Sequence, residues 1–246
     1  MIKQLKILRK RWFNKNTFAL EFYLPGIKPL PGQFFQVRVN EALEPFLNRP
    51  ISIASYFRNK LFLIIKVVGK GTKMLSEKKE GEFLTLLGPF GNGLKPKRKK
   101  SLILAGGIGV APLYFLAQSL YKNKVNFTFL YGAKTQDEII LKWNLMRMAN
   151  ESIFITEHGK NRETVVSAVK HIPIDDYEIA YTCGPKEMLI ELQKLNLPIS
   201  IYAFCEDFLG CGCGLCLGCA IMYKGKYKRI CEDGPVFQLK EINFEV

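Results

Sequence analysis

The sequence predicts a chain of the α/β plus β class, with an antiparallel β-barrel, a parallel α/β domain and a small cysteine-rich unit in that order. Strand-like segments rich in β-branched and aromatic residues dominate the first part of the chain, and strand-like and helix-like segments then alternate. Six of the seven cysteines lie between Cys205 and Cys231. The expected domains are residues 1–97, 98–198 and 199–246.

Six strand-like segments separated by short turns predict the barrel. They cover residues 2–8, 17–24, 33–39, 51–55, 61–68 and 83–88. Turn signals stand at Pro25–Gly26, Pro31–Gly32 and Gly88–Pro89. One short helix is expected at about residues 72–79.

Alternation of strands and helices predicts a parallel, doubly wound sheet in the second domain. The expected strands cover residues 101–105, 125–133, 152–156 and 177–184. The expected helices cover residues 111–121, 137–148, 163–170 and 186–195.

The third unit starts near Ile199 and includes a hairpin that turns at Lys224–Lys226. It is too small to be held together by apolar burial alone, so a bound metal is expected.

Composition and charge exclude few functions. The 246 residues are 48% hydrophobic and 24% charged, as is ordinary for a globular protein. The formal net charge is +14, from 36 Lys and Arg against 22 Asp and Glu. The clearest basic run, residues 95–100, has no interleaved aromatic residues, which a single-strand-binding surface would need. We interpret it as a solvated linker and expect no nucleic-acid partner.

No membrane association is expected either. The N-terminal segment MIKQLKILRKRWF lacks the small-residue cleavage site of a secretory signal. Residues 101–121 carry no charge over a membrane-spanning length, but AGGIGVAP at their centre predicts a strand, a loop and a helix. Without a secretory signal, clustered cysteines favour metal binding over disulfides and indicate a cytoplasmic location.

Four of these cysteines have the spacing of iron–sulfur ligands. Cys211, Cys216, Cys219 and Cys231 form the pattern C-x4-C-x2-C-x11-C, and C-x4-C-x2-C with a later cysteine is typical of plant-type [2Fe–2S] centres. Intervening glycines allow the backbone to wrap closely around the cluster.

Two alternatives stay open for this cysteine pattern. The first is a structural zinc site, although zinc favours two C-x2-C pairs and only Cys216–Cys219 clearly forms one. In the second, Cys213 replaces Cys211 as a ligand. Cys183 and Cys205 are expected to lie outside the cluster.

Two short motifs in the barrel could hold a phosphate. Arg49, Pro50, Ile51 and Ser52 open a strand, where an arginine beside a hydroxyl can bind a pyrophosphate and a flavin edge. Gly69–Thr72 precedes the short helix, whose first amides can face a phosphate. A surface arginine and an ordinary strand–turn–helix connection are the alternatives.

Two further motifs lie at strand ends in the second domain. Gly106, Gly107 and Gly109 form a loop similar to a dinucleotide loop, but Pro112 stands where the last glycine of G-x-G-x-x-G would be. Cys183, Gly184 and Pro185 follow a later strand, at the edge where open α/β sheets bind ligands. Cys183 could instead be a small buried apolar residue.

Together, RPIS, GGIGVAP and CGP in this order resemble the ferredoxin–NADP reductase superfamily. CGCGLCLGC followed by CEDGPVF resembles, within it, the electron-transfer subunits of class 1B dihydroorotate dehydrogenases. The resemblance spans nearly the whole chain, and the cysteine block with DGPVF is its most specific part.

The resemblance implies an oxidoreductase subunit that carries FAD and a [2Fe–2S] cluster and uses NAD as co-substrate. It implies a partner subunit with FMN, in a heterotetramer with two copies of each, for pyrimidine biosynthesis. Such a subunit needs no catalytic side chains of its own, because the cofactors carry the chemistry. The implied FAD contacts are Arg49, Pro50, Ile51, Ser52, Ile64, Ile65, Lys66, Gly71 and Thr72, with Lys66 where the family often has arginine. The implied cluster ligands are Cys211, Cys216, Cys219 and Cys231.

Two other functions stay possible at this stage. One is an NAD(P)H-dependent iron–sulfur flavoprotein reductase with a ferredoxin or sulfur-compound partner. The other is a zinc-stabilised binding module without enzymatic activity. If the chain is instead the electron-transfer subunit that the resemblance implies, its cluster must lie near a surface that contacts the partner subunit. Leu209, Leu215 and Leu217 between the glycines are candidates for that contact, or for shielding the cluster from water.

Overall fold

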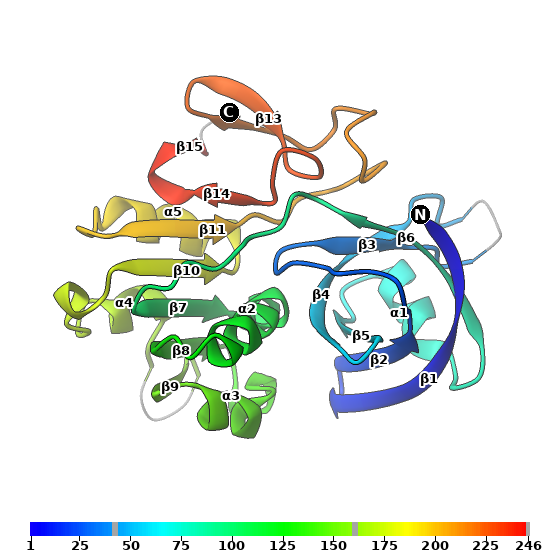
Figure 1. Ribbon diagram of the computed structural model, residues 1–246, viewed down its shortest axis with the longest axis horizontal. Helices are drawn as coiled ribbons and strands as arrows, with labels where there is room; N and C mark the ends of the chain where they lie inside the picture. The colour runs from blue at the N-terminus through cyan, green and yellow to red at the C-terminus, as the bar shows by residue number, and fades with distance from the viewer. Residues whose placement is uncertain (41–43, 159–161, 245–246) are drawn as a thin grey trace.

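The N-terminal part of the chain folds into a closed antiparallel barrel. The computed structural model describes residues 1–40, 44–158 and 162–244. The barrel runs in the order β1-β2-β5-β4-β3-β6 and lies on the right of Figure 1. Its strands are β1 (Ile2–Asn14), β2 (Thr17–Tyr23), β3 (Phe34–Val37), β4 (Arg49–Phe57), β5 (Lys60–Lys66) and β6 (Phe83–Phe90). The predicted short helix is α1 (Lys70–Glu77).

Strand β3 has one face in the barrel core and the other against the C-terminal part of the chain. Successive side chains in a strand point to opposite faces. Phe35 and Val37 are buried in the barrel core. Phe34 instead packs in a second core that contains Cys219 and Cys231. All four residues of this strand are therefore buried, although only half of them face the barrel interior.

The second domain contains a six-stranded sheet in the order β14-β11-β10-β7-β8-β9. Its strands are β7 (Ser101–Gly106), β8 (Phe127–Ala133), β9 (Glu151–Thr156), β10 (Ile179–Cys183), β11 (Ser200–Phe204) and β14 (Val236–Gln238). The first five are parallel to their neighbours and β14 is antiparallel. The helices are α2 (Val110–Lys122), α3 (Lys142–Met148), α4 (Val165–Val169) and α5 (Lys186–Lys194). Short 3-10 turns are η1 (Gly107–Gly109), η2 (Gln136–Glu138), η3 (Ile174–Asp176) and η4 (Leu239–Glu241).

The helix expected over residues 137–148 is interrupted. A 3-10 turn, η2, is followed by α3, which starts only at Lys142. Leu141 between them has a left-handed backbone, with φ of +59°. That conformation breaks a right-handed helix, so the prediction was wrong over its first turn.

Helix α2 joins the sheet to the barrel. It follows β7 and η1, so the uncharged run 101–121 is divided into strand, turn and helix as predicted. Leu113 and Leu116 of α2 share a core with Ala54 and Ile64 of the barrel. Within the described ranges, no helix has both the length and the apolar character needed to cross a membrane.

The C-terminal segment, orange to red in Figure 1, lies along both larger parts. Strands β12 (Ala220–Tyr223), β13 (Lys226–Arg229) and β15 (Ile242–Asn243) form a small sheet in the order β13-β12-β15. β12 and β13 are the predicted hairpin. β11, with which the predicted third unit begins, pairs with β10 in the large sheet, so that sheet continues across residue 199. The two boundaries between the three domains stay a prediction.

Candidate functional site

A pocket of about 270 Å³ lies where the barrel, the start of α2 and the C-terminal segment meet. All predicted FAD contacts except Gly71 line it: Arg49, Pro50, Ile51, Ser52, Ile64, Ile65, Lys66 and Thr72. Residues of the C-terminal segment line it too: Cys205, Glu206, Asp207, Leu209, Ile230 and Pro235. Two short motifs and one strand that are separate in sequence thus share one cavity, which we call the barrel pocket.

Gly71 lies directly against the guanidinium group of Arg49. A Cβ on Gly71 would lie 2.6 Å from Arg49 Cζ, so no larger residue leaves the arginine where it is. Arg49 Nη1 donates to the backbone carbonyls of Leu47 and Asn48. The guanidinium is therefore held beside the start of α1, where helix amides favour an anion. This arrangement fits a pyrophosphate group.

Thr72 holds the turn into α1 instead of facing a ligand with its hydroxyl. The backbone N–H groups of Val68 and Gly69 donate to Thr72 Oγ1 (2.9 and 3.2 Å), and the hydroxyl donates to the Gly69 carbonyl (3.0 Å). These bonds satisfy donors that a helix start would leave unpaired. Thr72 thereby fixes the position of Gly71.

Lys66 links the barrel to the second domain. Its Nζ lies 2.9 Å from Glu138 Oε2 in η2, and both side chains are about three-quarters covered. An ammonium is a compact charge without the planar fork of the arginine that the family often has here. Lys66 is therefore already paired with a carboxylate at the mouth of the barrel pocket.

A second cavity of about 770 Å³ opens at the carboxyl ends of the sheet strands, and we call it the nucleotide cleft. The predicted residues Gly106, Gly107, Gly109, Gly184 and Pro185 line it. Carboxyl ends of parallel strands are where open α/β sheets bind ligands.

Gly109 brings two strand ends of this cleft together. A Cβ on Gly109 would overlap the carbonyl of Cys183 and lie 2.9 Å from Gly184 N. Only glycine lets η1 pack directly on the end of β10. Gly107 has φ of +54°, and the space where its Cβ would stand is open. The loop thus presents bare backbone to the cleft, which suits close approach of a pyrophosphate.

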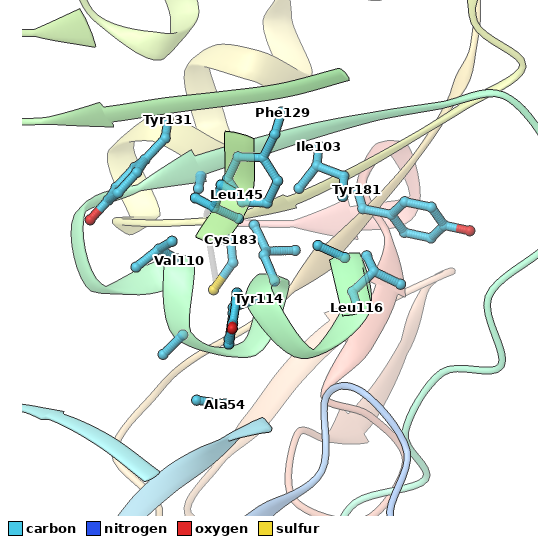
Figure 2. Close-up of a cluster of buried hydrophobic side chains, with 14 of the residues drawn as sticks. Ala54, Ile103, Val110, Tyr114, Leu116, Phe129, Tyr131, Leu145, Tyr181 and Cys183 are labelled. Carbon is cyan, nitrogen blue, oxygen red and sulfur yellow. The ribbon is translucent and has the colours of Figure 1, made fainter. Parts of the chain in front are cut away.

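Cys183 is buried beneath the cleft. Figure 2 shows it among the side chains of Ile103, Val110 and Tyr114. Its Sγ donates to Glu206 Oε1 at 3.8 Å. Burial first, and the neighbouring carboxylate second, raise the pKa of the Cys183 thiol well above its usual value. The thiol is therefore neutral near pH 7 and cannot act as a thiolate nucleophile.

The barrel pocket and the nucleotide cleft adjoin. Lys66, Ile108 and Glu206 line both of them. A ring bound in the barrel pocket and a second ring bound in the cleft can thus meet at this junction. Glu206 was not predicted from the sequence. It lies two residues after the end of β11, so assigning that strand to the sheet would have placed it near the ligand-binding edge.

The four predicted cluster cysteines lie in two pairs. Cys219 Sγ and Cys231 Sγ are 3.3 Å apart. Cys211 and Cys216 form the other pair, in which the Cys216 backbone N–H donates to Cys211 Sγ at 3.4 Å. Among the described residues, no three His, Cys, Asp or Glu side chains converge as ligands of a single ion would. Two thiol pairs suit a centre with two irons, each taking two cysteines, better than one zinc ion.

Backbone donors surround these sulfurs. Cys213 N and Cys216 N donate to Cys211 Sγ, and Gly214 N donates to Cys231 Sγ (3.1 Å). Burial opposes ionisation of Cys211, but the donated N–H groups outweigh it and lower its pKa to about 6. Such donors stabilise thiolate ligands and tune a cluster's potential. Cys213 and Cys216 are exposed, Cys211 is half-buried, and Cys219 and Cys231 are buried.

Residues 206–243 match the family model of the iron–sulfur cluster binding domain of dihydroorotate dehydrogenase B. Residues 103–194 match that of the oxidoreductase NAD-binding domain. The chain is 35% identical over 247 residues to the dihydroorotate dehydrogenase B (NAD(+)) electron transfer subunit of Caldanaerobacter subterraneus subsp. tengcongensis, with 97% of each chain covered. It is 37% identical over 257 residues to that of Desulforamulus reducens, covering 98% of this chain and 97% of the relative.

The chain belongs to this family of electron transfer subunits. The predicted family, and with it an electron-transferring oxidoreductase subunit with iron–sulfur and NAD-binding domains, is confirmed. The assignment of individual ligands to individual residues stays a prediction.

Solved structures confirm the fold of the family in this chain. The structure of an NADH-dependent reduced ferredoxin-NADP oxidoreductase, described for flavin-based electron bifurcation, matches with a TM-score of 0.87 and 25% identity, covering 98% of this chain and 90% of that one. A ferredoxin NADP+ reductase from Neisseria gonorrhoeae with bound FAD and NADP matches with a TM-score of 0.69 and 17% identity, covering 84% and 94%. The barrel and the sheet are thus arranged as in these two solved structures.

Proposed function

We propose that this chain carries electrons between an FMN-containing dihydroorotate dehydrogenase subunit and NAD, through a [2Fe–2S] cluster and FAD, in pyrimidine biosynthesis. One observation carries the proposal: the barrel pocket borders the nucleotide cleft through Lys66, Ile108 and Glu206 and the cysteine segment through Leu209 and Ile230. A cytoplasmic location stays part of the proposal and rests on the clustered cysteines.

FAD occupies the barrel pocket in this proposal. Arg49 and the first amides of α1 would hold its pyrophosphate, and Pro50, Ile51 and Ser52 would contact it from β4. FAD supplies the exchange between the electron pair of NAD(H) and the single electrons of the cluster. The protein contributes placement: Glu206 and Cys183 fix the floor of the junction, and the apolar lining keeps water away from it.

NAD enters the nucleotide cleft, with its pyrophosphate on the Gly106–Gly109 loop. Close packing of Gly109 on the end of β10 keeps that loop next to Gly184 and Pro185. The nicotinamide end then reaches the junction with the barrel pocket. Cys211 with Cys216, and Cys219 with Cys231, would hold the two irons of the cluster.

Apolar side chains around the cysteines support a partner surface there. Phe208, Leu215 and Leu217 are 94%, 83% and 63% exposed. Leu209 is only 8% exposed and faces the barrel pocket, so it is not available for a partner contact. We place the contact with the FMN subunit on Phe208, Leu215 and Leu217, in a complex with two copies of each subunit.

The test is a dihydroorotate assay with and without the FMN subunit. The purified chain alone is expected to oxidise NADH with an artificial dye and to leave dihydroorotate unchanged. After co-purification with the FMN subunit, dihydroorotate oxidation should drive NAD reduction. Leu215→Glu should weaken the association, because a buried unpaired carboxylate is costly, and Leu8→Glu on the exposed side of β1 should not.

Oxidation of dihydroorotate by the chain alone would contradict the proposal, as would failure to bind any such FMN subunit. A ferredoxin-linked reductase is the second candidate, favoured by the 25% identical oxidoreductase that the chain matches over 98% of its length. NADH-dependent reduction of ferredoxin at the rate seen with the dye, together with no binding of the FMN subunit, would favour it.

A further inference from the structure

Gln36 of β3 is a fully buried polar side chain between the barrel and the cysteine segment. Its exposed fraction is 0%, and its Nε2 donates to the Leu209 carbonyl at 3.3 Å. No described residue donates to its Oε1, which is buried as well. If the amide were flipped, Gln36 Oε1 would face the Leu209 carbonyl oxygen, and two acceptors cannot form a hydrogen bond. The orientation with Nε2 toward Leu209 is therefore the correct one. Buried polar atoms are nearly always hydrogen-bonded, so the unpaired Oε1 of this glutamine is not explained by packing alone.

Gln36 occupies the outward face of β3, on the side of the cysteines. It shares that face with Phe34, which packs in the core that contains Cys219 and Cys231. Gln36 also pairs in register with Pro50 in the adjacent β4, and Pro50 lines the barrel pocket. The side chain thus lies between the strand that borders the proposed flavin and the loop that carries the cluster cysteines.

Gly212 of the cysteine loop rests on the Gln36 side chain. A Cβ on Gly212 would lie 2.7 Å from Gln36 Cγ and 2.8 Å from its Nε2. Gly212 has φ of +76°, a conformation that favours glycine. The loop therefore contacts Gln36 at two points, Gly212 directly after Cys211 and the Leu209 carbonyl two residues before it.

Leu209 connects this contact to the barrel pocket. Its carbonyl accepts the Gln36 amide while its side chain lines the pocket. Any shift of the loop on Gln36 therefore moves a wall of the proposed flavin site together with the first cluster cysteine. If Gln36 served only to fill space, an apolar residue would do so without a buried unpaired oxygen.

We propose that Gln36 is a positioning residue for electron transfer between FAD and the cluster. Its amide N–H holds the Leu209–Gly212 segment on β3, and its carbonyl oxygen places a fixed negative dipole end beside the cluster loop. The proposal rests on the proposed function. Substitution of residues that orient metal ligands, without binding the metal themselves, commonly alters metal affinity or activity. Hydrogen bonds and dipoles near an iron–sulfur cluster also shift its reduction potential.

Gln36→Met tests this role, because methionine keeps the length of the side chain and removes both polar atoms. The expected protein retains flavin, iron and labile sulfide, and reduces an artificial dye with NADH at the wild-type rate. Its cluster should show an altered electron paramagnetic resonance spectrum and a shifted midpoint potential. Reduction of the cluster by NADH, followed by stopped flow, should slow on the order of tenfold.

Gln33→Met is the matched control. Gln33 precedes the same strand and makes comparable bonds, to Leu30 N at 2.9 Å and the Gly91 carbonyl at 2.7 Å, away from the cysteine loop. It should leave the spectrum, potential and rate unchanged. If Gln36→Met loses its cluster, Gln36→Leu, which also removes both polar atoms, is measured instead, with the same expectation.

An unchanged spectrum, potential and cluster reduction rate in the cluster-containing Gln36 variant would overturn the proposal. So would equal changes in the Gln33 variant, which would indicate a general effect on the barrel. Failure of the proposed function is distinguishable, because it would appear in wild-type protein, as no NADH-dependent cluster reduction or as no binding of the FMN subunit.

Discussion

Replacement of Cys219 by serine is expected to abolish assembly of the iron–sulfur cluster. Cys219 Sγ is buried 3.3 Å from Cys231 Sγ. In the proposed ligand assignment, this pair provides two of the four thiolates that a [2Fe–2S] centre needs. Loss of one ligand leaves an iron with incomplete coordination. We expect iron and labile sulfide to fall to background, and the signal of the reduced cluster to disappear.

The same result is expected for serine at Cys211, Cys216 and Cys231. Cys213→Ser is the matched control, since Cys213 is exposed and donates its backbone N–H, which serine keeps, to Cys211 Sγ. This variant should retain iron, sulfide and the resonance signal. Full cluster content in Cys211→Ser together with loss in Cys213→Ser would contradict the ligand assignment.

Arg49→Ala is expected to release FAD. The guanidinium is the charged group of the barrel pocket that lies beside the start of α1, and a charge-assisted contact to a phosphate contributes about 1.5–3 kcal/mol. FAD should therefore bind roughly ten- to a hundredfold more weakly. Flavin retained after dialysis, read from absorbance relative to protein, measures the effect.

Arg9→Ala provides the control for Arg49, because Arg9 is exposed on β1 and does not line the pocket. It should retain flavin as well as wild type does. If Arg49→Ala keeps its flavin through the same dialysis, the FAD site does not lie in the barrel pocket as proposed.

The sequence predicts most of the fold because its signals are local. Segments rich in β-branched and aromatic residues mark the six barrel strands, and AGGIGVAP correctly divides the uncharged run 101–121 into β7, η1 and α2. The cysteine spacing likewise brings Cys211 to Cys216 and Cys219 to Cys231. Each of these features is encoded by residues close together in the sequence: a strand segment, the AGGIGVAP loop or the C-x4-C-x2-C-x11-C spacing.

The remaining features depend on contacts distant in sequence. β11 belongs to the large sheet because it pairs with β10, which lies about 20 residues earlier in the sequence. Glu206 gains its place at the junction of the two cavities only through that pairing. In the sequence, Gln36 looks like an ordinary strand residue. Its burial depends on the cysteine loop, which lies more than 170 residues later in the chain.

Anaerobic titration of the isolated chain with NADH tests the central claim most directly. The claim is that one chain connects a nucleotide cleft, a flavin pocket and a cluster, because the barrel pocket borders both of the other sites. We predict that NADH bleaches the flavin absorbance and produces the paramagnetic signal of a reduced [2Fe–2S] cluster in the same sample. A protein whose flavin is reduced by NADH while its assembled cluster stays oxidised, or one that holds neither cofactor, would contradict the account.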